Sequence, residues 1–492
     1  MKSNYKLSKS TFIRGLQCEK SLYLYKHHYN LKDPISPALQ ATFDRGNTIG
    51  LLAQQLFPNG RDASPENHFK VYESVGKTNE FINQGETIIY EATFVHNEVL
   101  CALDILVKDD EGWKAYEVKS SKEVSPTYIN DAAIQYHTIT NSGIDLKDIS
   151  IVHINNQYIR GEELDINQLF SIESVKDRVE ELLPHMPDKI SRFKEVIASP
   201  SIPDIDIGGH CFKPYECDFK GECWKQIPDY SVFNIANLRK NKMFDLYKQG
   251  VITLDQIDLE KIPLNASQTI QVNSELDGSS HIDKPKIREF INNLKYPLYF
   301  LDYETINPAI PYYKGVRPYQ NLVFQYSLHI KTSPDSEVIH KEYLADPKKD
   351  PRIDFVKRLI DDCGETGDIL VYNIGFERTK TKDLIEPFPE YSDELKSIVN
   401  RLKDLMIPFQ KKWYYTPQMK GKHSIKKVLP ALVPDMSYDD LDIKEGETAS
   451  NTFKTMIQGT FKGDEDGVRR QLLEYCELDT FSMVKILEKL KK

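Results

Sequence analysis

The segment that decides the fold of the second half of the chain is residues 298–305, which reads LYFLDYET. Its apolar residues predict a buried strand, and Asp302 and Glu304 interrupt that pattern two residues apart. Because side chains alternate along a strand, both carboxylates lie on one face. Two unpaired carboxylates in a buried strand carry a heavy desolvation cost unless a cation neutralises them. The segment therefore predicts a central strand that holds a metal ion.

Two later segments of the same half carry further polar residues. Residues 371–377, which read VYNIGFE, predict a strand, a turn and the start of a helix that carries Glu377. Near the chain end, Tyr475 and Asp479 lie four residues apart in a helical run and share a face. Considered alone, Tyr475 has a non-functional interpretation as a core aromatic residue, and Asn373 has one as a turn residue. The ordered set is more informative than its members.

In order and spacing, this set resembles the DEDDy-type 3′–5′ exonucleases of the DnaQ-like, RNase H-like fold. The family usually has aspartate where this chain has Glu377, one methylene longer. The resemblance implies that Asp302, Glu304 and Asp479 hold two divalent ions, Mg²⁺ or Mn²⁺, with Glu377 in the catalytic set. It also implies that Tyr475 orients the attacking water.

A segment rich in lysine and aromatic residues follows within the same half. It contains Lys411, Lys412, Trp413, Tyr414, Lys426 and Lys427. Cations mixed with stacking rings are typical of surfaces that bind single-stranded nucleic acid. The alternative is an ordinary solvated loop.

A hairpin in the first half carries a second group of acids. Residues 99–107 and 113–121 predict two strands joined by a turn at 108–112. A turn centred between Asp110 and Glu111 places Asp104 directly across from Glu117, and alternation puts Lys119 on the face of Glu117. Carboxylates that hold a metal, with a lysine to offset charge on phosphorus, suit phosphodiester hydrolysis. The alternative is an exposed hairpin with alternating polar residues.

The hairpin resembles the core of the PD-(D/E)XK nucleases, and Gln135 fits the glutamine of their RecB-type branch. That branch usually has a metal-binding histidine in an early helix, at the place where this chain has Gly50. Glu91 is a candidate substitute ligand, and a solvated strand acid is its equal alternative.

Four cysteines bracket the first half of the chain: Cys18, Cys211, Cys217 and Cys223. Structural zinc usually has paired ligands with two to four residues between them, which disfavours zinc here. Four thiolates around a [4Fe–4S] cluster tolerate varied spacing, and the arrangement resembles the iron–sulfur RecB-type nucleases, including the CRISPR-associated ones. Zinc or ordinary buried thiols stay as alternatives. Cys101, Cys363 and Cys476 lie in apolar segments of the sequence and are interpreted as packing residues.

Length and composition set the wider frame. A chain of 492 residues is too long for one core, and we expect domains at 1–228 and 291–492 with a helical connector at 229–290. The net charge of −10 discourages indiscriminate binding to a polyanion, so contact with nucleic acid requires local basic patches or bound cations. No signal peptide or membrane span is expected, and seven cysteines fit a reducing compartment, which predicts the cytoplasm.

The expected fold class is α/β: a restriction-endonuclease-like PD-(D/E)XK domain, a small helical connector and an RNase H-like exonuclease domain. The expected function is a metal-dependent nuclease with two active sites, acting on single-stranded ends, with DNA favoured over RNA. One alternative is a nucleic-acid-binding or assembly protein whose catalytic sites have degenerated. Another keeps one active domain and uses the other for positioning.

Overall fold

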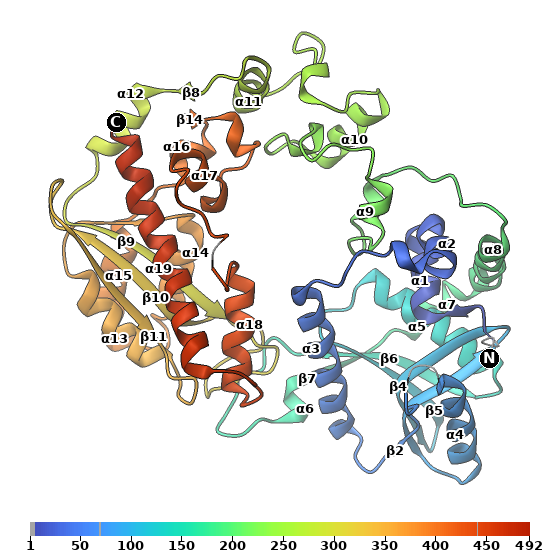
Figure 1. The fold of residues 1–492 in the computed structure, drawn as a ribbon. Coiled ribbons are helices and arrows are strands. Elements are labelled where there is room, and N and C mark those ends of the chain that lie inside the picture. The colour runs from blue at the N-terminus through green and yellow to red at the C-terminus, as the bar shows by residue number, and fades with distance from the viewer. Residues whose placement is uncertain (1–4, 68–69, 440) are drawn as a thin grey trace. The chain divides into compact units, whose positions relative to one another are not determined.

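The computed structural model describes residues 5–67, 70–439 and 441–492. The chain forms two compact units, the first from Met1–Gln226 with Ala309–Tyr319 and the second from Ile227–Pro308 with Gln320–Lys492 (Figure 1). The segment 229–290, expected as a connector, falls within the second unit. Both units combine sheets and helices, which confirms the α/β class at that level.

The first unit contains a sheet in the order β2-β3-β4-β5-β6-β7, with β1 paired to β4. Its strands are β1 (Leu7–Ser8), β2 (Arg61–Asp62), β3 (Ile88–His96), β4 (Val99–Asp109), β5 (Gly112–Lys119), β6 (Leu146–Ile154) and β7 (Phe170–Ser174). Strands β3, β4 and β5 form an antiparallel meander, and β5 pairs in parallel with β6. The parallel pairing requires a crossover, which α5 (Pro126–Asn141) provides.

Helix α5 begins where the sequence specifies a helix start. The hydroxyl of Ser125 accepts a hydrogen bond from the backbone N–H of Tyr128, and Pro126 occupies the first turn. Its apolar face, which includes Ala132 and Ile134, is fully buried in the main core of this unit. The other helices are α1 (Lys9–Gln17), α2 (Glu19–His27), α3 (Pro37–Ala53), α4 (Val71–Asn83), α6 (Ile166–Leu169), α7 (Lys176–Glu180), α8 (Met186–Ala198) and α9 (Lys220–Cys223).

The second unit is built on a sheet in the order β11-β10-β9-β12-β13. Its strands are β9 (Leu298–Ile306), β10 (Leu322–Lys331), β11 (Val338–Leu344), β12 (Asp368–Val371) and β13 (Leu402–Asp404). Strand β9 is central, antiparallel to β10 and parallel to β12. The predicted strand 298–305 is therefore confirmed as a central strand.

Helices cover both faces of this second sheet. Tyr299, Leu301 and Tyr303 of β9 share a core with α13 (Arg352–Cys363) and α15 (Ser392–Arg401). The opposite face of β9 meets α18 (Gly446–Ile457) and α19 (Glu465–Leu490). Asp302 and Glu304 lie on that second face by alternation, so they point toward α18 and α19.

Residues 227–292 add a small helical subdomain to the second unit. It contains α10 (Lys240–Lys248), α11 (Ala266–Asp277) and α12 (Lys284–Asn292), and β8 (His281–Ile282) pairs with β14 (Tyr414–Tyr415). Its own core includes Val232, Leu246 and Val272. The remaining helices are α14 (Ile374–Asp383), α16 (Ile407–Gln410) and α17 (Ile425–Leu432).

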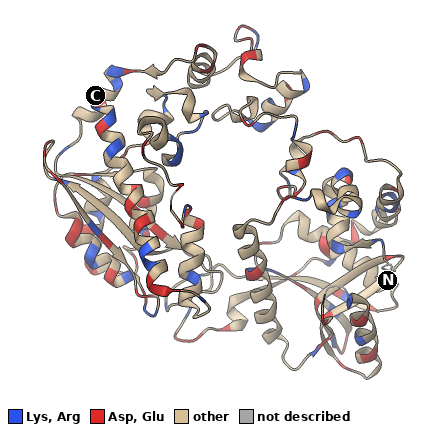
Figure 2. Ribbon diagram, viewed as in Figure 1, with Lys and Arg blue, Asp and Glu red and all other residues tan. Residues whose placement is uncertain are grey.

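Within the described ranges, none of the helices is both long enough and apolar enough to cross a membrane. Acidic and basic residues are interspersed along the ribbons of both units (Figure 2). Any strongly charged site is therefore local, and its residues must be identified individually.

Candidate functional sites

The hairpin of the first unit has the predicted pairing. Strands β4 and β5 pair Ile105 with Tyr116 and Asp109 with Gly112, and the same count places Asp104 across from Glu117. Oδ2 of Asp104 accepts a hydrogen bond of 2.6 Å from the backbone N–H of Val118. Nζ of Lys119 lies 2.8 Å from Oε1 of Glu117, which confirms that these two side chains share a face.

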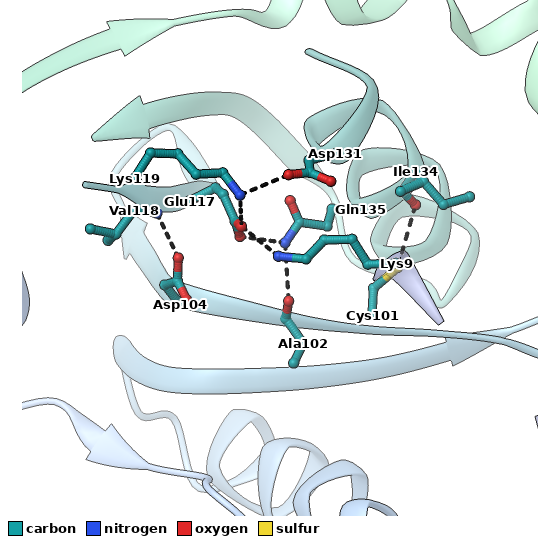
Figure 3. A network of polar contacts seen from close by, with 10 residues as sticks. All are labelled: Lys9, Cys101, Ala102, Asp104, Glu117, Val118, Lys119, Asp131, Ile134 and Gln135. Atoms are coloured by element: carbon teal, nitrogen blue, oxygen red, sulfur yellow. Dashed lines mark hydrogen bonds and ion pairs between the residues drawn. The ribbon is translucent and has the colours of Figure 1, made fainter. Parts of the chain in front are cut away.

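Three groups from outside the hairpin complete this site (Figure 3). Gln135 of α5 donates from Nε2 to Oε2 of Glu117 at 2.6 Å and to the carbonyl of Ala102 at 3.0 Å. Asp131, one turn earlier on α5, accepts from Lys119 at 2.7 Å. The ammonium group of Lys9, in the first turn of α1, also bonds Oε1 of Glu117. Glu117 is thus held by two ammonium groups and an amide.

Gln135 was predicted from the sequence, whereas Lys9 and Asp131 were not. Asp131 precedes Gln135 by four residues on the same helix, so the helical period offered a signal for it. Lys9 offered none, because it lies 108 residues from Glu117 in the chain and reaches it only through tertiary packing.

The charges of this site shift the pKa values of its acids in opposite directions. Burial acts to raise the pKa of Glu117, but the ammonium groups of Lys119 and Lys9 outweigh it and hold that pKa at about 2. Burial and the charge of Glu117 raise the pKa of Asp104 to about 7. Glu117 is therefore the ionised member of the pair, and Asp104 is the member that a bound cation would ionise.

Glu91 lies beside these acids in an unusual backbone conformation. The β3–β4 ladder pairs Tyr90 with Ile105 and Ala92 with Leu103, which leaves Glu91 across from Asp104. Its φ of 54° is in the left-handed region that costs a non-glycine residue free energy. Burial, Asp104 and Glu117 raise the pKa of Glu91 to about 8. These observations favour the ligand interpretation of Glu91 over that of a solvated strand acid.

The first unit nevertheless does not bring all three of these acids together. Among the described residues, Glu91, Asp104 and Glu117 do not form a group whose ligand atoms all lie within 4.8 Å of one another. Gly50, at the place of the family histidine, lies in α3, and nothing occupies the space within 4 Å where a Cβ would be.

A polar pocket adjoins the end of β5. It is lined by Thr42, Arg45, Ser120, Ser121, Lys122, Glu123, Tyr128, Asn156 and Tyr319. Nε of Arg45 is buried and has no hydrogen-bond partner among the described residues. Lys119 lies 5.1 Å from the ring centroid of Tyr128, so the pocket borders the acid site. This pocket could not be predicted from the sequence, because its residues come from four separate segments.

The four predicted cysteines line a single pocket in the first unit. Cys18 separates α1 from α2, Cys211 and Cys217 flank a loop, and Cys223 ends α9. In the described structure, no three of their sulfur atoms lie within 4.8 Å of one another. Four thiolates around one zinc ion would lie about 3.8 Å apart, which follows from a Zn–S bond of about 2.3 Å. The spacing is therefore too wide for a single ion.

Polar contacts fasten the two chain segments that carry these cysteines. Nη2 of Arg14 donates to Oδ2 of Asp218 at 2.9 Å. Gln17 donates to the carbonyl oxygens of His210 and Tyr215, both at 2.8 Å. Burial, reinforced by the other thiols of the pocket, raises the pKa of Cys223 to about 11. The remaining cysteines, Cys101, Cys363 and Cys476, are fully buried.

The acids of the second unit converge as the strand pattern predicts. Ligand oxygens of Asp302, Glu304 and Asp479 all lie within 4.8 Å of one another. The first two residues come from the central strand β9, and Asp479 comes from α19. The hydroxyl of Tyr438 donates to Oδ1 of Asp479 at 2.6 Å. Tyr438 was not identified from the sequence, because it lies in a loop 41 residues before its partner.

These acids carry an electrostatic cost in the absence of a cation. Burial, followed by repulsion from Asp479, Glu377 and Glu304, raises the pKa of Asp302 well above its usual range. Burial and Asp479 raise the pKa of Glu304 to about 8. Burial also raises the pKa of Asp479, to about 6, against the opposing effect of its hydrogen bonds. Hard divalent cations, which prefer carboxylate oxygens, would remove this cost.

Two other predicted residues border the acid cluster. Tyr475 is 4% exposed, and its ring centroid lies 6.3 Å from that of Tyr438. Glu377 lies in the first turn of α14, and its buried Oε2 has no hydrogen-bond partner among the described residues. Burial and Asp404 raise the pKa of Glu377 to about 8. Asp404 is a further residue that the sequence did not indicate, and it accepts from the backbone N–H of Asn373 at 3.2 Å.

The predicted nucleic-acid-binding segment is divided in the structure. Lys412 is 1% exposed, and its ammonium group lies 4.0 Å from the ring centroid of Tyr415, so its prediction as a surface residue is wrong. Burial against an aromatic ring, reached through a left-handed turn at Lys412, explains the difference. Lys411 and Lys427 are exposed, whereas Trp413 and Tyr414 are half-buried.

Lys426 belongs to the acid site and not to a separate surface. Its ammonium group lies 5.2 Å from the ring centroid of Tyr475 and 5.4 Å from that of Tyr438. Its charge acts to lower the pKa values of Glu304 and Asp479. It is thus a resident cation at the edge of the acid cluster.

Comparison with known proteins gives limited matches. Residues 299–424 match the family described as Domain of unknown function (DUF2779), a segment that includes Asp302, Glu304 and Glu377 but ends before Asp479. An uncharacterized protein of Mycoplasma genitalium is 27% identical over 222 residues, which are 41% of this chain and 33% of that protein. An uncharacterized protein of Ureaplasma parvum is 24% identical over 305 residues, 56% of this chain and 43% of that protein. The chain spans less than half the length of these relatives.

Proposed function

We propose that the second unit is a metal-dependent 3′–5′ exonuclease of the DnaQ-like, RNase H-like class. The observation that carries the proposal is the convergence of Asp302, Glu304 and Asp479 within 4.8 Å on a buried strand and a helix. The order of the sheet also supports the proposal, because three antiparallel strands are followed by two parallel ones. Asp302 and Glu304 lie on the central strand of this sheet. Three oxygen ligands at this spacing fit Mg²⁺ or Mn²⁺.

The chain's own residues have separate roles in this mechanism. Two bound divalent ions would activate water and stabilise the leaving 3′-oxygen. Tyr475, whose pKa burial raises, keeps its proton and orients a water molecule as a hydrogen-bond donor. Tyr438 fixes the carboxylate of Asp479 through its 2.6 Å hydrogen bond. Lys426 offsets part of the negative charge when a phosphate enters.

We propose that the first unit is a second nuclease domain, of the RecB-type PD-(D/E)XK class. Asp104 and Glu117, with Glu91 nearby, supply the carboxylates, Lys119 supplies the cation and Gln135 orients Glu117. The adjoining pocket offers Arg45 and Lys122 to a phosphate group of the strand. Nucleic acid, with DNA favoured over RNA, is the proposed substrate of both units.

A second candidate role for the first unit has one specific observation in its favour. The ammonium group of Lys9 bonds Glu117, where a divalent cation would otherwise contact that carboxylate. A site neutralised in this way would bind and position nucleic acid without cutting it. Lys9 must move from Glu117 for the nuclease role, so a Lys9 variant distinguishes the two roles.

We propose that the cysteine pocket holds a [4Fe–4S] cluster. Four thiols line it, and their separation exceeds that of ligands to a single zinc ion. Such a cluster would link the Cys18 segment to the 211–223 segment across nearly two hundred residues. We also propose the cytoplasm as the location, because thiolate ligands of this kind fit a reducing compartment.

The decisive experiment uses the full chain with end-labelled single- and double-stranded DNA and RNA, with and without EDTA. We expect Mg²⁺- or Mn²⁺-dependent release of nucleotides from 3′ ends of single-stranded DNA. In a Lys119→Met background, which disables the proposed site of the first unit, an Asp302→Asn variant should lose this activity, while an exposed matched variant on α19, Glu474→Gln, should retain it. Metal-independent cleavage, or full activity of Asp302→Asn in that background, would contradict the proposal.

A further inference from the structure

A second group of potential metal ligands lies in the second unit, distinct from the acid cluster. It consists of His329, His340 and Glu477, whose ligand atoms all lie within 4.8 Å of one another. His329 on β10 and His340 on β11 are directly opposite partners in the antiparallel ladder, with ring centroids 4.5 Å apart. Glu477 reaches them from α19, so three separate elements converge here.

Buried hydroxyl groups hold one nitrogen of each imidazole. Nδ1 of His329 hydrogen-bonds the hydroxyl of Thr480 at 2.8 Å, and Nε2 of His340 hydrogen-bonds that of Ser327 at 3.0 Å. Among the described residues, this leaves Nε2 of His329 and Nδ1 of His340 without a hydrogen-bond partner. The latter lies 3.7 Å from Oε1 of Glu477. Histidine ligands in metal sites usually have their second nitrogen held in this way, which fixes the ring and its tautomer.

We propose that His329, His340 and Glu477 bind a transition-metal ion of the Zn²⁺ class, with water as the fourth ligand. Two imidazoles and one carboxylate match zinc sites with an open position, whereas Mg²⁺ prefers oxygen ligands. Ligand atoms on a tetrahedral zinc ion would lie about 3.4 Å apart, given a Zn–N bond of about 2.1 Å. The distance of 3.7 Å between Nδ1 of His340 and Oε1 of Glu477 is already close to this value. The other ligand atoms lie within 4.8 Å, so they must approach by at most about 1.4 Å, with a slight turn of the stacked rings.

The exposure of the three side chains allows that contraction. His329 is buried at 4% exposure and stays in place, while the side chains of His340 and Glu477 are 25% and 48% exposed and have room to move. A bound ion would connect β10 and β11 to α19, the helix that carries Asp479. It would thus stabilise the position of α19 through ligands that the acid cluster does not use.

The test measures zinc retained by the full chain after gel filtration in excess Mg²⁺, which occupies the acid cluster. We expect the wild-type protein to hold one more equivalent of Zn²⁺ per chain than either His340→Gln or Glu477→Gln. Both variants keep all four cysteines of the first unit, so zinc bound there cancels in the difference. His185→Gln, an exposed histidine of the first unit, is the matched control and should equal the wild type.

Two further measurements identify the ligands and the stabilising effect. With Co²⁺ in place of Zn²⁺, the wild-type minus His340→Gln difference spectrum should show visible bands without thiolate charge-transfer absorption. Zn²⁺ should raise the melting temperature of the wild type by more than it raises that of His340→Gln. Equal zinc content in the wild type and in folded Glu477→Gln, or a difference spectrum dominated by thiolate bands, would overturn the proposal.

Discussion

Tyr438 donates a hydrogen bond of 2.6 Å to Oδ1 of Asp479, so a loop residue orients the carboxylate that α19 brings to β9. Tyr475 lies four residues before Asp479 on the helix, and its ring centroid lies 6.3 Å from that of Tyr438. Two tyrosines therefore border one acid, and we expect them to have different tasks. Tyr438 acts on the position of Asp479, whereas Tyr475 faces the acid cluster.

The tyrosine pair gives the first prediction. Tyr438→Phe should weaken Mn²⁺ binding, because Asp479 loses an orienting hydrogen bond that also lowers its pKa. Tyr475→Phe should keep Mn²⁺ affinity but lower kcat by about tenfold to a thousandfold, as expected for a lost water-orienting group. Isothermal titration with Mn²⁺ and single-turnover exonuclease assays measure the two effects. The same metal affinity in both variants would contradict this division of roles.

The second prediction concerns stability and pH in the metal-free protein. The pKa of Glu304 is about 8 in the folded state, against an ordinary value of 4.5. Between these values the folded state holds a proton that the unfolded state has lost, so this contribution to stability is present below about pH 4.5 and is lost as pH rises through 8. The melting temperature in EDTA should therefore fall over this range, and Mn²⁺ should restore it.

Two variants separate this effect from the general pH response of the chain. Glu304→Gln should flatten the decline in melting temperature, because the amide does not titrate. Glu474→Gln, an exposed residue on α19, should follow the wild-type curve. One outcome would show that Glu304 does not titrate as described. In it, the melting temperature of the wild type in EDTA rises from pH 5 to pH 8, and the Glu304→Gln curve stays parallel to it.

The third prediction tests the first unit. Lys119→Met should lower the rate of metal-dependent cleavage by this unit by about a hundredfold or more. The rate is measured in an Asp302→Asn background, in which the second unit is inactive. Gln135→Leu should reduce it less, because the amide only orients Glu117. In the same background, Lys9→Met should increase Mn²⁺ affinity if the nuclease role is correct. No cleavage from the Asp302→Asn protein on any substrate would instead favour the binding role.

The fourth prediction concerns the cysteine pocket. Anaerobically purified protein should be brown and contain about four iron atoms per chain, as a [4Fe–4S] cluster requires. Cys18→Ser should lose most of this iron, whereas Cys101→Ala, which changes a buried packing thiol, should retain it. Stoichiometric zinc without iron, or full iron content in Cys18→Ser, would contradict the assignment.

The parts of both sites that depend on local periodicity could be predicted from the sequence. Strand alternation was sufficient to place Asp302 with Glu304 and Glu117 with Lys119, and the hairpin count paired Asp104 with Glu117. Contacts made by tertiary packing alone could not be predicted. Lys9 reaches Glu117 through the pairing of β1 with β4, and His329 meets His340 only because of the β10–β11 register. Lysine is usually a surface residue, and the burial of Lys412 depends on its packing against the ring of Tyr415.

Helix α1 has a mechanical consequence for the first unit. Lys9, in its first turn, bonds Glu117, and Cys18, directly after its last residue, lines the cysteine pocket. Nine residues of α-helix form a stiff rod of about 13 Å, because each residue adds about 1.5 Å. A shift at the thiol end is therefore transmitted to the ammonium end. The cysteine pocket and the acid site are therefore joined by one short helix, and we expect a change in the position of Cys18 to alter the contact between Lys9 and Glu117.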